Sequence, residues 1–279
     1  MRQQSIQRIR RSFRPQLEGL EDRCVPASIV VDTLVDEVTN PTTTSLREAI
    51  AQARSSSADD SITFDSILSG TIKLTQGELL IGNLYMPPNS GTLTIDGGTK
   101  VTLDAGGASQ VLDVQSGTVT LIGVTLTNGY GDLGGGLMVW DTATVTLENS
   151  TVSNCKAKTA GGGIFNIGTL TLTNSKVSNN YSSSTGGGVH NDGRYGGNMT
   201  ATGSTFSGNE ARQNGGAIFN GGSGLSITTS TFAGNRASFG KGNDIYIYNT
   251  TSDALDIHDN LSAIDIVQEV SKPKGGGRK

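Results

Sequence analysis

A unit of about 27 residues recurs along the second half of this chain, and the repeat limits the fold more than any other feature. An aliphatic residue that follows a glycine cluster returns at intervals of 27, 25, 29 and 27 residues, at Leu137, Ile164, Val189, Ile218 and Ile245. A second apolar landmark returns at intervals of 26, 25, 29 and 26 residues, at Leu126, Val152, Val177, Phe206 and Phe232. Two landmarks that share one period of this length predict a solenoid, a propeller or another repeat array.

Each unit reads as strands joined by tight turns. The unit GGGIFNIGTLTLTNSKVSNN begins at Gly161, and its Thr/Leu alternation predicts a half-buried strand with Leu170 and Leu172 pointing inward. It has no helical segment and is too short for a four-stranded propeller blade. We therefore predict an all-β fold, one turn of a parallel β-helix per unit, with roughly seven turns between Ser61 and Asn249.

The recurring residues have a structural explanation. In a coil, each side chain stacks on its counterpart about 4.8 Å away, so a corner that needs glycine or asparagine in one turn needs it in the next. The repeat positions interpreted in this way are Gly162, Gly163, Ile164, Asn166, Gly187, Gly188, Val189, Asn191, Gly215, Gly216, Ile218, Asn220, Val152, Val177, Phe206, Phe232, Asn180, Asn209 and Asn235.

The ends of such a coil must be covered, and the N-terminal cover is visible in the sequence. In TSLREAIAQA, Ser45 and Glu48 form a capping box, and Leu46 and Ile50 begin an apolar helical stripe. We expect a basic leader at 1–27, an N-terminal cap of strand and helix at 28–60, the β-helix at 61–250, a C-terminal cap at 251–270 and a basic tail at 271–279.

Charge and composition exclude several classes of protein. The two ends hold ten of the 21 basic and three of the 25 acidic residues, so residues 27–270 have a net charge of −11. An acidic body disfavours a nucleic-acid partner. The sequence contains no run of 18 apolar residues, so we predict no transmembrane helix. The two cysteines, Cys24 and Cys155, and the two histidines, His190 and His258, lack the spacing of a disulfide framework or a metal site, so we expect no metal and no cofactor.

Three segments resemble known families. GGGIFN, GGGVHN, GGAIFN, FSGNEA and FAGNRA resemble the GGAI and FxxN repeats of chlamydial-type polymorphic outer membrane proteins, which belong with the pectin-lyase-like right-handed β-helices. TSLREAIAQA resembles the CSLREA cap of bacterial surface proteins, with Thr44 in place of the cysteine. RRSFRPQLEGLEDRCVPA resembles an N-terminal segment of extracellular proteins from planctomycete-type bacteria. These resemblances imply a right-handed coil and an extracellular or cell-envelope location.

Carboxylates are candidate catalytic groups because the fold class includes polysaccharide lyases and hydrolases, whose sites gather acids and a base. Asp59 and Asp60 follow the cap helix and are interpreted as loop residues. Asp96 and Asp104 lie in TIDGGTKVTLDAGG and are interpreted as turn residues.

An irregular insertion in the longest turn carries the other candidates. His190, Asp192 and Arg194 are the catalytic candidates, although His190 takes the place of Phe165 and Phe219 and is interpreted first as a stacked side chain. Tyr195 and Tyr130, in neighbouring glycine-rich loops, are candidates for stacking on a sugar ring. Cys155 takes the turn position of Asn180, Asn209 and Asn235 and is interpreted as structural.

We therefore expect a non-catalytic exported surface or envelope protein that contacts cell-surface polysaccharide or another surface protein. Two alternatives stay open. One is a polysaccharide lyase or glycoside hydrolase with its site on the loop at 189–199 or on the face beside it, and the other is a structural spacer. An enzyme should bring carboxylates and a base together in one groove, whereas a binding module should expose aromatic and amide side chains.

Overall fold

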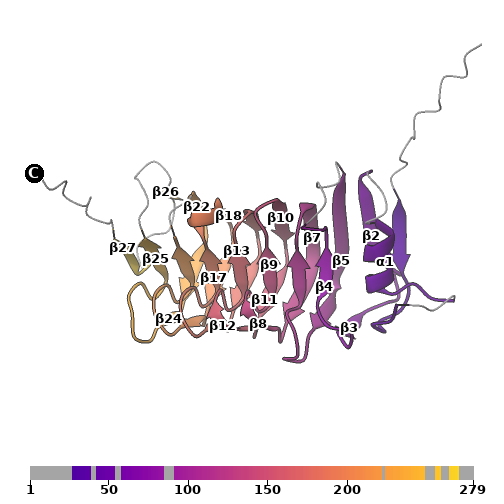
Figure 1. Ribbon diagram of the computed structural model, residues 1–279, viewed down its shortest axis with the longest axis horizontal. Helices are drawn as coiled ribbons and strands as arrows, with labels where there is room; N and C mark the ends of the chain where they lie inside the picture. Colours follow the sequence, from indigo (N-terminus) through magenta and orange to yellow (C-terminus); the bar gives the residue numbers. More distant parts are fainter. Residues whose placement is uncertain are drawn as a thin grey trace, which may run out of the picture.

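The chain winds into a rod whose successive turns lie side by side (Figure 1). The computed structural model describes residues 27–38, 42–53, 58–84, 91–221, 224–248, 255–258 and 264–269, the four residues 255–258 by their backbone alone. Three sheets run along the rod, and their strands pair in parallel with those of the turns before and after. The predicted parallel β-helix is confirmed.

The long sheet has 14 strands, because most turns contribute either one long strand or two short strands to it. Its strands are β1 (Ser28–Val31), β2 (Asp60–Phe64), β3 (Gly70–Lys73), β5 (Thr92–Asp104), β7 (Gly117–Thr127), β10 (Ala143–Glu148), β11 (Thr151–Ser153), β14 (Thr169–Thr173), β15 (Lys176–Ser178), β18 (Asn198–Thr202), β19 (Thr205–Ser207), β22 (Leu225–Thr228), β23 (Thr231–Ala233) and β26 (Leu255–His258).

The other two sheets complete each turn. The eight-stranded sheet consists of β4 (Leu79–Ile81), β6 (Leu112–Val114), β9 (Leu137–Val139), β13 (Ile164–Asn166), β17 (Val189–Asn191), β21 (Ile218–Asn220), β25 (Ile245–Tyr248) and β27 (Ile266–Glu269). The five-stranded sheet consists of β8 (Tyr130–Leu133), β12 (Lys156–Ala160), β16 (Tyr181–Ser182), β20 (Glu210–Ala211) and β24 (Arg236–Ala237).

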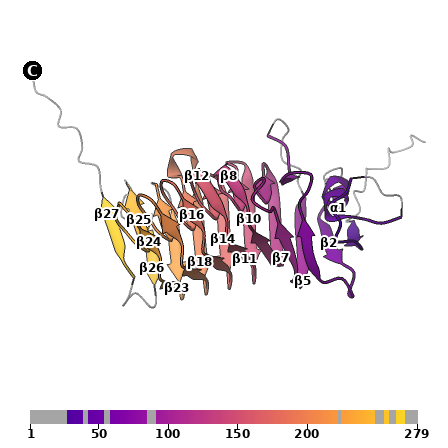
Figure 2. The same ribbon diagram turned by 90° about the horizontal axis from the view of Figure 1, so that it is seen from below.

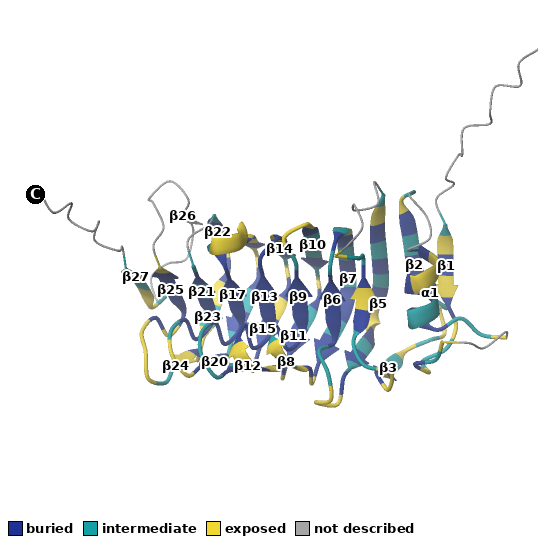
Figure 3. Ribbon diagram, in the orientation of Figure 1, coloured by how far each residue is buried: buried dark blue, intermediate teal, exposed yellow. Residues whose placement is uncertain are grey.

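The apolar landmarks of the repeat form continuous inward columns. Leu137, Ile164, Val189, Ile218 and Ile245 are partners in register across the eight-stranded sheet, and all are fully buried. The second landmark forms a column in the long sheet, Leu126, Val152, Val177, Phe206 and Phe232. The dark blue strands in Figure 3 trace this core along the rod. Successive side chains of a strand point to opposite faces of the sheet, so every second residue enters the core and the others face outward.

Glycine and asparagine occupy the corners for separate reasons. Gly186 has φ +65°, and a Cβ there would lie 2.4 Å from the Val189 carbonyl oxygen, so only glycine fits. The buried amides of Asn180, Asn209 and Asn235 form a ladder, in which the Asn180 backbone N–H donates to Asn209 Oδ1 at 3.1 Å and Asn209 N–H donates to Asn235 Oδ1 at 3.0 Å. These amides satisfy backbone groups that the corner leaves without strand partners.

Helix α1 (Leu46–Ala53) covers the N-terminal end of the core, and Figure 2 shows it beside β2 at that end of the rod. Its first turn forms the predicted reciprocal bonds: Ser45 N–H donates to Glu48 Oε2 at 2.9 Å, and Glu48 N–H donates to Ser45 Oγ at 3.2 Å. Leu46, Ala49, Ile50 and Ala53 are buried against the coil.

The other predicted end segments are only partly described. Residues 251–270 were expected to form a C-terminal cap, but β26 pairs with β22 and β27 pairs with β25 in parallel. These two strands therefore continue the coil, because LDIH and IVQE keep the alternation of the repeat. The leader up to residue 26 and the tail at 271–279 lie outside the described residues.

Candidate binding groove

A groove of about 730 Å³ lies on the outward face of the eight-stranded sheet. Its floor comes from β9, β13 and β17, and its walls come from the segments that precede and follow those strands. The lining residues are Leu84, Leu133, Met138, Trp140, Asp141, Thr159, Ala160, Phe165, Ile167, Ser184, Thr185, His190, Asp192, Arg194 and Tyr195. Eight of these fifteen residues are apolar or aromatic and seven are polar or charged, so the groove offers both apolar surface and hydrogen-bonding groups to a ligand.

The floor residues Met138, Phe165 and His190 belong to a longer column of stacked side chains. Met138, Phe165, His190, Phe219 and Tyr246 are partners in register across β9, β13, β17, β21 and β25. Successive ring centroids are 4.9, 4.6 and 5.5 Å apart from Phe165 to Tyr246, with interplanar angles of 11°, 15° and 19°. Because parallel strands place equal positions directly above one another, the rings lie face to face along the rod and turn their edges to the groove.

His190 is held on both sides within this column. Its Nδ1 lies 2.8 Å from Thr185 Oγ1, and its Nε2 lies 3.8 Å from Asp192 Oδ2. Burial lowers the pKa of His190, and the neighbouring Asp192 only partly offsets that effect. At neutral pH the imidazole is therefore uncharged.

Asp192 and Arg194 form a close pair beside His190. Asp192 begins the short 3₁₀ helix Gly193–Tyr195 and accepts three hydrogen bonds from Arg194: from its backbone N–H at 3.0 Å, Nε at 3.0 Å and Nη2 at 2.6 Å. Burial alone would raise the pKa of Asp192, but the hydrogen bonds of His190 and Arg194 outweigh it and hold the pKa well below its usual range. The three predicted catalytic candidates thus lie together, with the carboxylate charge neutralised by Arg194.

Trp140 lines the groove and Asp113 is its hydrogen-bond partner, and the repeat analysis singled out neither residue. Trp140 follows β9 at the position that Ile167 and Asp192 occupy after β13 and β17, and its Nε1 donates to Asp113 Oδ1 at 2.7 Å. Gln115 Nε2 donates to the other oxygen of Asp113 at 3.0 Å. Burial raises the pKa of Asp113, and these two bonds oppose the rise. The sequence did carry a signal for Asp113. It is an aspartate at an outward position of β6, where the next two turns have Met138 and Phe165.

The other acidic candidates have structural roles away from the groove. Asp60 accepts from Ala27 N–H at 2.8 Å, and Asp59 accepts from Thr92 N–H at 2.8 Å. Asp96 and Asp104 cap turns by accepting from Gly98 N–H and Gly106 N–H, each at 2.9 Å. The described residues contain no group of three or more His, Cys, Asp or Glu that could hold a metal ion.

The two predicted sugar-stacking tyrosines lie in different places. Tyr195 stands at the groove rim with 65% of its surface exposed, and the Arg194 guanidinium lies 5.9 Å from its ring centroid. Tyr130 begins β8 and lines a second groove, on the edge where the long and five-stranded sheets meet. The two tyrosines therefore line different grooves.

Cys155, which the sequence analysis interpreted as a structural residue, lies in the core of the coil. Its buried thiol replaces an asparagine in the amide ladder, where Cys155 N–H donates to Asn180 Oδ1 at 2.9 Å. Burial raises the pKa of Cys155 to about 12. Cys24 and the side chain of His258 lie outside the described residues.

Comparison with known proteins agrees with this architecture. The model of the right handed beta helix region family matches residues 88–232, about half of the chain. The chain belongs to this family of right-handed β-helix proteins. Comparisons with curated proteins and with solved structures returned no match. No helix in the described part of the chain is long and apolar enough to cross a membrane.

Proposed function

We propose that this protein binds an uncharged polysaccharide in the groove over the eight-stranded sheet and does so without cleaving it. The observation that carries the proposal is the groove itself: Trp140 and Tyr195 line an open cavity on the aromatic floor of Phe165 and His190. Aromatic surface beside a few hydrogen-bonding groups suits a sugar, which has apolar ring faces and polar hydroxyl rims.

The charges of the groove favour an uncharged ligand. Asp141, Asp192 and Arg194 give the lining a net charge of −1, since burial keeps His190 neutral. The only lining cation, Arg194, is already paired with Asp192 at 2.6 Å. The negative charges of a polyuronide would be repelled by this groove and by the acidic body of the protein, because Arg194 is already paired.

The same charges argue for binding over catalysis. A glycoside hydrolase needs one carboxyl group that keeps its proton to protonate the leaving group. Asp192 does not keep its proton at neutral pH, because its pKa lies well below the usual range of an aspartate. Asp113 has a raised pKa, but both of its oxygens accept bonds from Trp140 and Gln115, and it does not line the groove.

The cellular setting of the proposal is the bacterial exterior or envelope. It is supported by the resemblance of the GGAI/FxxN repeats, the CSLREA-like cap and the N-terminal segment to those of surface proteins. A long rod with its groove parallel to the axis would suit contact with an extended surface polymer.

The test uses Trp140, which is the single tryptophan of the chain. Neutral oligosaccharides such as cello-, xylo- and manno-oligomers are titrated while tryptophan emission is recorded, and calorimetry gives the Kd independently. Binding should shift the emission, and Trp140→Ala should weaken affinity about tenfold, because a stacked aromatic face contributes on the order of 1 kcal/mol. Phe239→Ala is the matched control, since Phe239 is 83% exposed outside the groove.

Other outcomes select the alternatives. New reducing ends, or unsaturated products that absorb in the ultraviolet, would establish a hydrolase or lyase. No binding by either method, with both neutral and charged glycans, would favour a structural spacer.

A further inference from the structure

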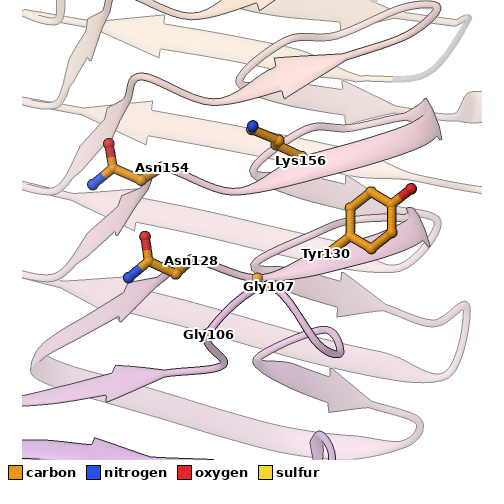
Figure 4. Close-up of a pocket in the computed structure, with 7 residues that line it drawn as sticks. Gly106, Gly107, Asn128, Tyr130, Asn154 and Lys156 are labelled. Atoms are coloured by element: carbon orange, nitrogen blue, oxygen red, sulfur yellow. The ribbon is translucent and has the colours of Figure 1, made fainter.

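A second groove, of about 490 Å³, lies on a different edge of the rod. It opens where turns of the long sheet lead into β8 and β12, and Figure 4 shows its side chains on adjacent rungs. Gly106, Gly107, Asn128, Gly129, Tyr130, Asn154 and Lys156 line it. None of these residues lines the groove that contains Trp140.

Tyr130 supplies an aromatic surface with free space beside it. Tyr130 is 39% exposed, and the Lys158 ammonium lies 5.4 Å from the centroid of its ring. The adjoining Gly106–Gly107 turn has φ +59° and +76°, and a Cβ built on either glycine would meet nothing within 4 Å. This side-chain-free turn leaves room for a planar or ring-shaped ligand next to Tyr130.

Two stacked asparagines provide polar groups on the opposite side. Asn128 and Asn154 have φ 54° and 56°, and Figure 4 shows their amides pointing the same way from neighbouring rungs. Asn128 Nδ2 donates to Asp104 Oδ1 at 2.9 Å, which orients that amide. Within the described residues, neither amide oxygen accepts a hydrogen bond, so both can accept from a ligand hydroxyl.

Lys156 adds a positive charge that has no partner in the protein. It stands in register between Tyr130 on β8 and Tyr181 on β16, and its side chain is exposed. Among the described residues it forms no ion pair, whereas Lys158 is paired with Asp132 at 2.8 Å. A free cation beside an aromatic ring, on a body with net charge −11, selects an anionic ligand locally.

We propose that this second groove binds a sugar residue that carries a carboxylate or a sulfate group. The sugar ring lies against Tyr130, the acidic group pairs with Lys156, and hydroxyl groups donate to the oxygens of Asn128 and Asn154. This ligand class differs from the uncharged chain proposed for the other groove, and the second site stands whether or not the first one binds.

The experiment is calorimetry on the full chain with three probes: oligogalacturonates, chondroitin sulfate oligosaccharides and neutral dextran oligomers. At least one anionic probe should bind, more weakly at high ionic strength, and dextran should not bind here. Lys156→Gln and Tyr130→Ala should each weaken binding about tenfold. Lys73→Gln is the matched control, because it removes an equal charge from an exposed site on β3.

The two anionic probes identify the acidic group, since binding of one alone assigns carboxylate or sulfate. Failure of both probes would overturn the proposal. Equal losses in Lys156→Gln and Lys73→Gln would also overturn it, because they would indicate attraction to the whole surface. Binding that shifts Trp140 emission would place the ligand in the other groove and would likewise overturn the proposal for this site.

Discussion

Arg47 on α1 donates two hydrogen bonds to the buried carboxylate of Asp36, from Nε at 2.7 Å to Oδ1 and from Nη2 at 3.1 Å to Oδ2. The same guanidinium donates to the carbonyl oxygens of Gly77 and Glu78, and Asp36 also accepts from the backbone N–H of Thr75 and Gln76. This one ion pair therefore joins the cap helix to the first turn of the coil.

We expect Asp36→Ala to lower the free energy of unfolding by about 3 kcal/mol, because it leaves Arg47 and two amides without their buried acceptor. Urea denaturation followed by circular dichroism measures the change. Asp132→Ala removes an exposed ion pair with Lys158 and should change stability by less than about 1 kcal/mol. Equal effects in the two variants would contradict this account of the cap.

Asp36 also makes the cap sensitive to acid. Burial alone would raise the pKa of Asp36, but the bonds from Arg47, Gln76 and Thr75 outweigh it and lower the pKa. Its stabilisation is therefore complete above the unfolded value of about 3.9 and is lost as pH falls through the lower folded value. A stability curve between neutral and acid pH should fall less steeply in Asp36→Asn than in the wild type.

His190→Phe should keep or increase stability, because Phe165 and Phe219 already fill the equivalent positions and the ring stack continues. The wild-type pKa of His190 is lowered by burial, so the unfolded chain binds the proton first as pH falls below about 6.5. The wild type therefore loses stability in that acid range, and the phenylalanine variant should lose less. A variant that unfolds at neutral pH would show that the bond to Thr185 matters more than stacking.

Asn209→Ala should cost about 3 kcal/mol, since the Asn209 amide donates to the Val177 carbonyl at 2.8 Å and to Asn235 Oδ1 at 3.0 Å, all buried. Cys155→Asn should be tolerated, because asparagine is the residue of that ladder in the next three turns. Thermal unfolding compares the two variants directly. Comparable destabilisation in both would show that the ladder does not extend to Cys155.

The Cys155 thiol should resist modification in the folded chain, because burial raises its pKa to about 12. The measurement is a thiol-reagent assay on a Cys24→Ser chain, before and after denaturation. Rapid labelling of the native protein would contradict the burial of this side chain.

Asp113→Asn should stabilise the fold by about 1 kcal/mol at neutral pH, since it removes a buried charge and keeps an acceptor for Trp140 Nε1. Burial raises the folded pKa of Asp113, so the folded wild type holds its proton to a higher pH and loses stability as pH rises through that value. The advantage of the variant should thus disappear in acid. Chemical denaturation at two pH values tests this, and tryptophan emission reports whether Trp140 keeps its place.

The sequence alone determined the coil. Strand pairing in a solenoid joins equivalent positions of neighbouring repeats, so the period read from Ile164 and Val177 also specifies which residues become partners. The capping box of Ser45 and Glu48 was equally readable, because its bonds join residues three positions apart. Local and periodic information was sufficient for these features.

Which side chains share a groove depends on the three-dimensional path of the chain. Trp140 bonds to Asp113 across 27 residues, and Tyr130 and Tyr195 separate into two grooves, because the direction in which a corner points depends on how far the backbone has turned around the axis. Likewise, whether a carboxylate such as Asp192 is free or neutralised depends on burial and on its partner, Arg194, in three dimensions. These groups each occur in a single turn and not in the repeat, and for that reason the chemistry of the grooves follows from the three-dimensional structure.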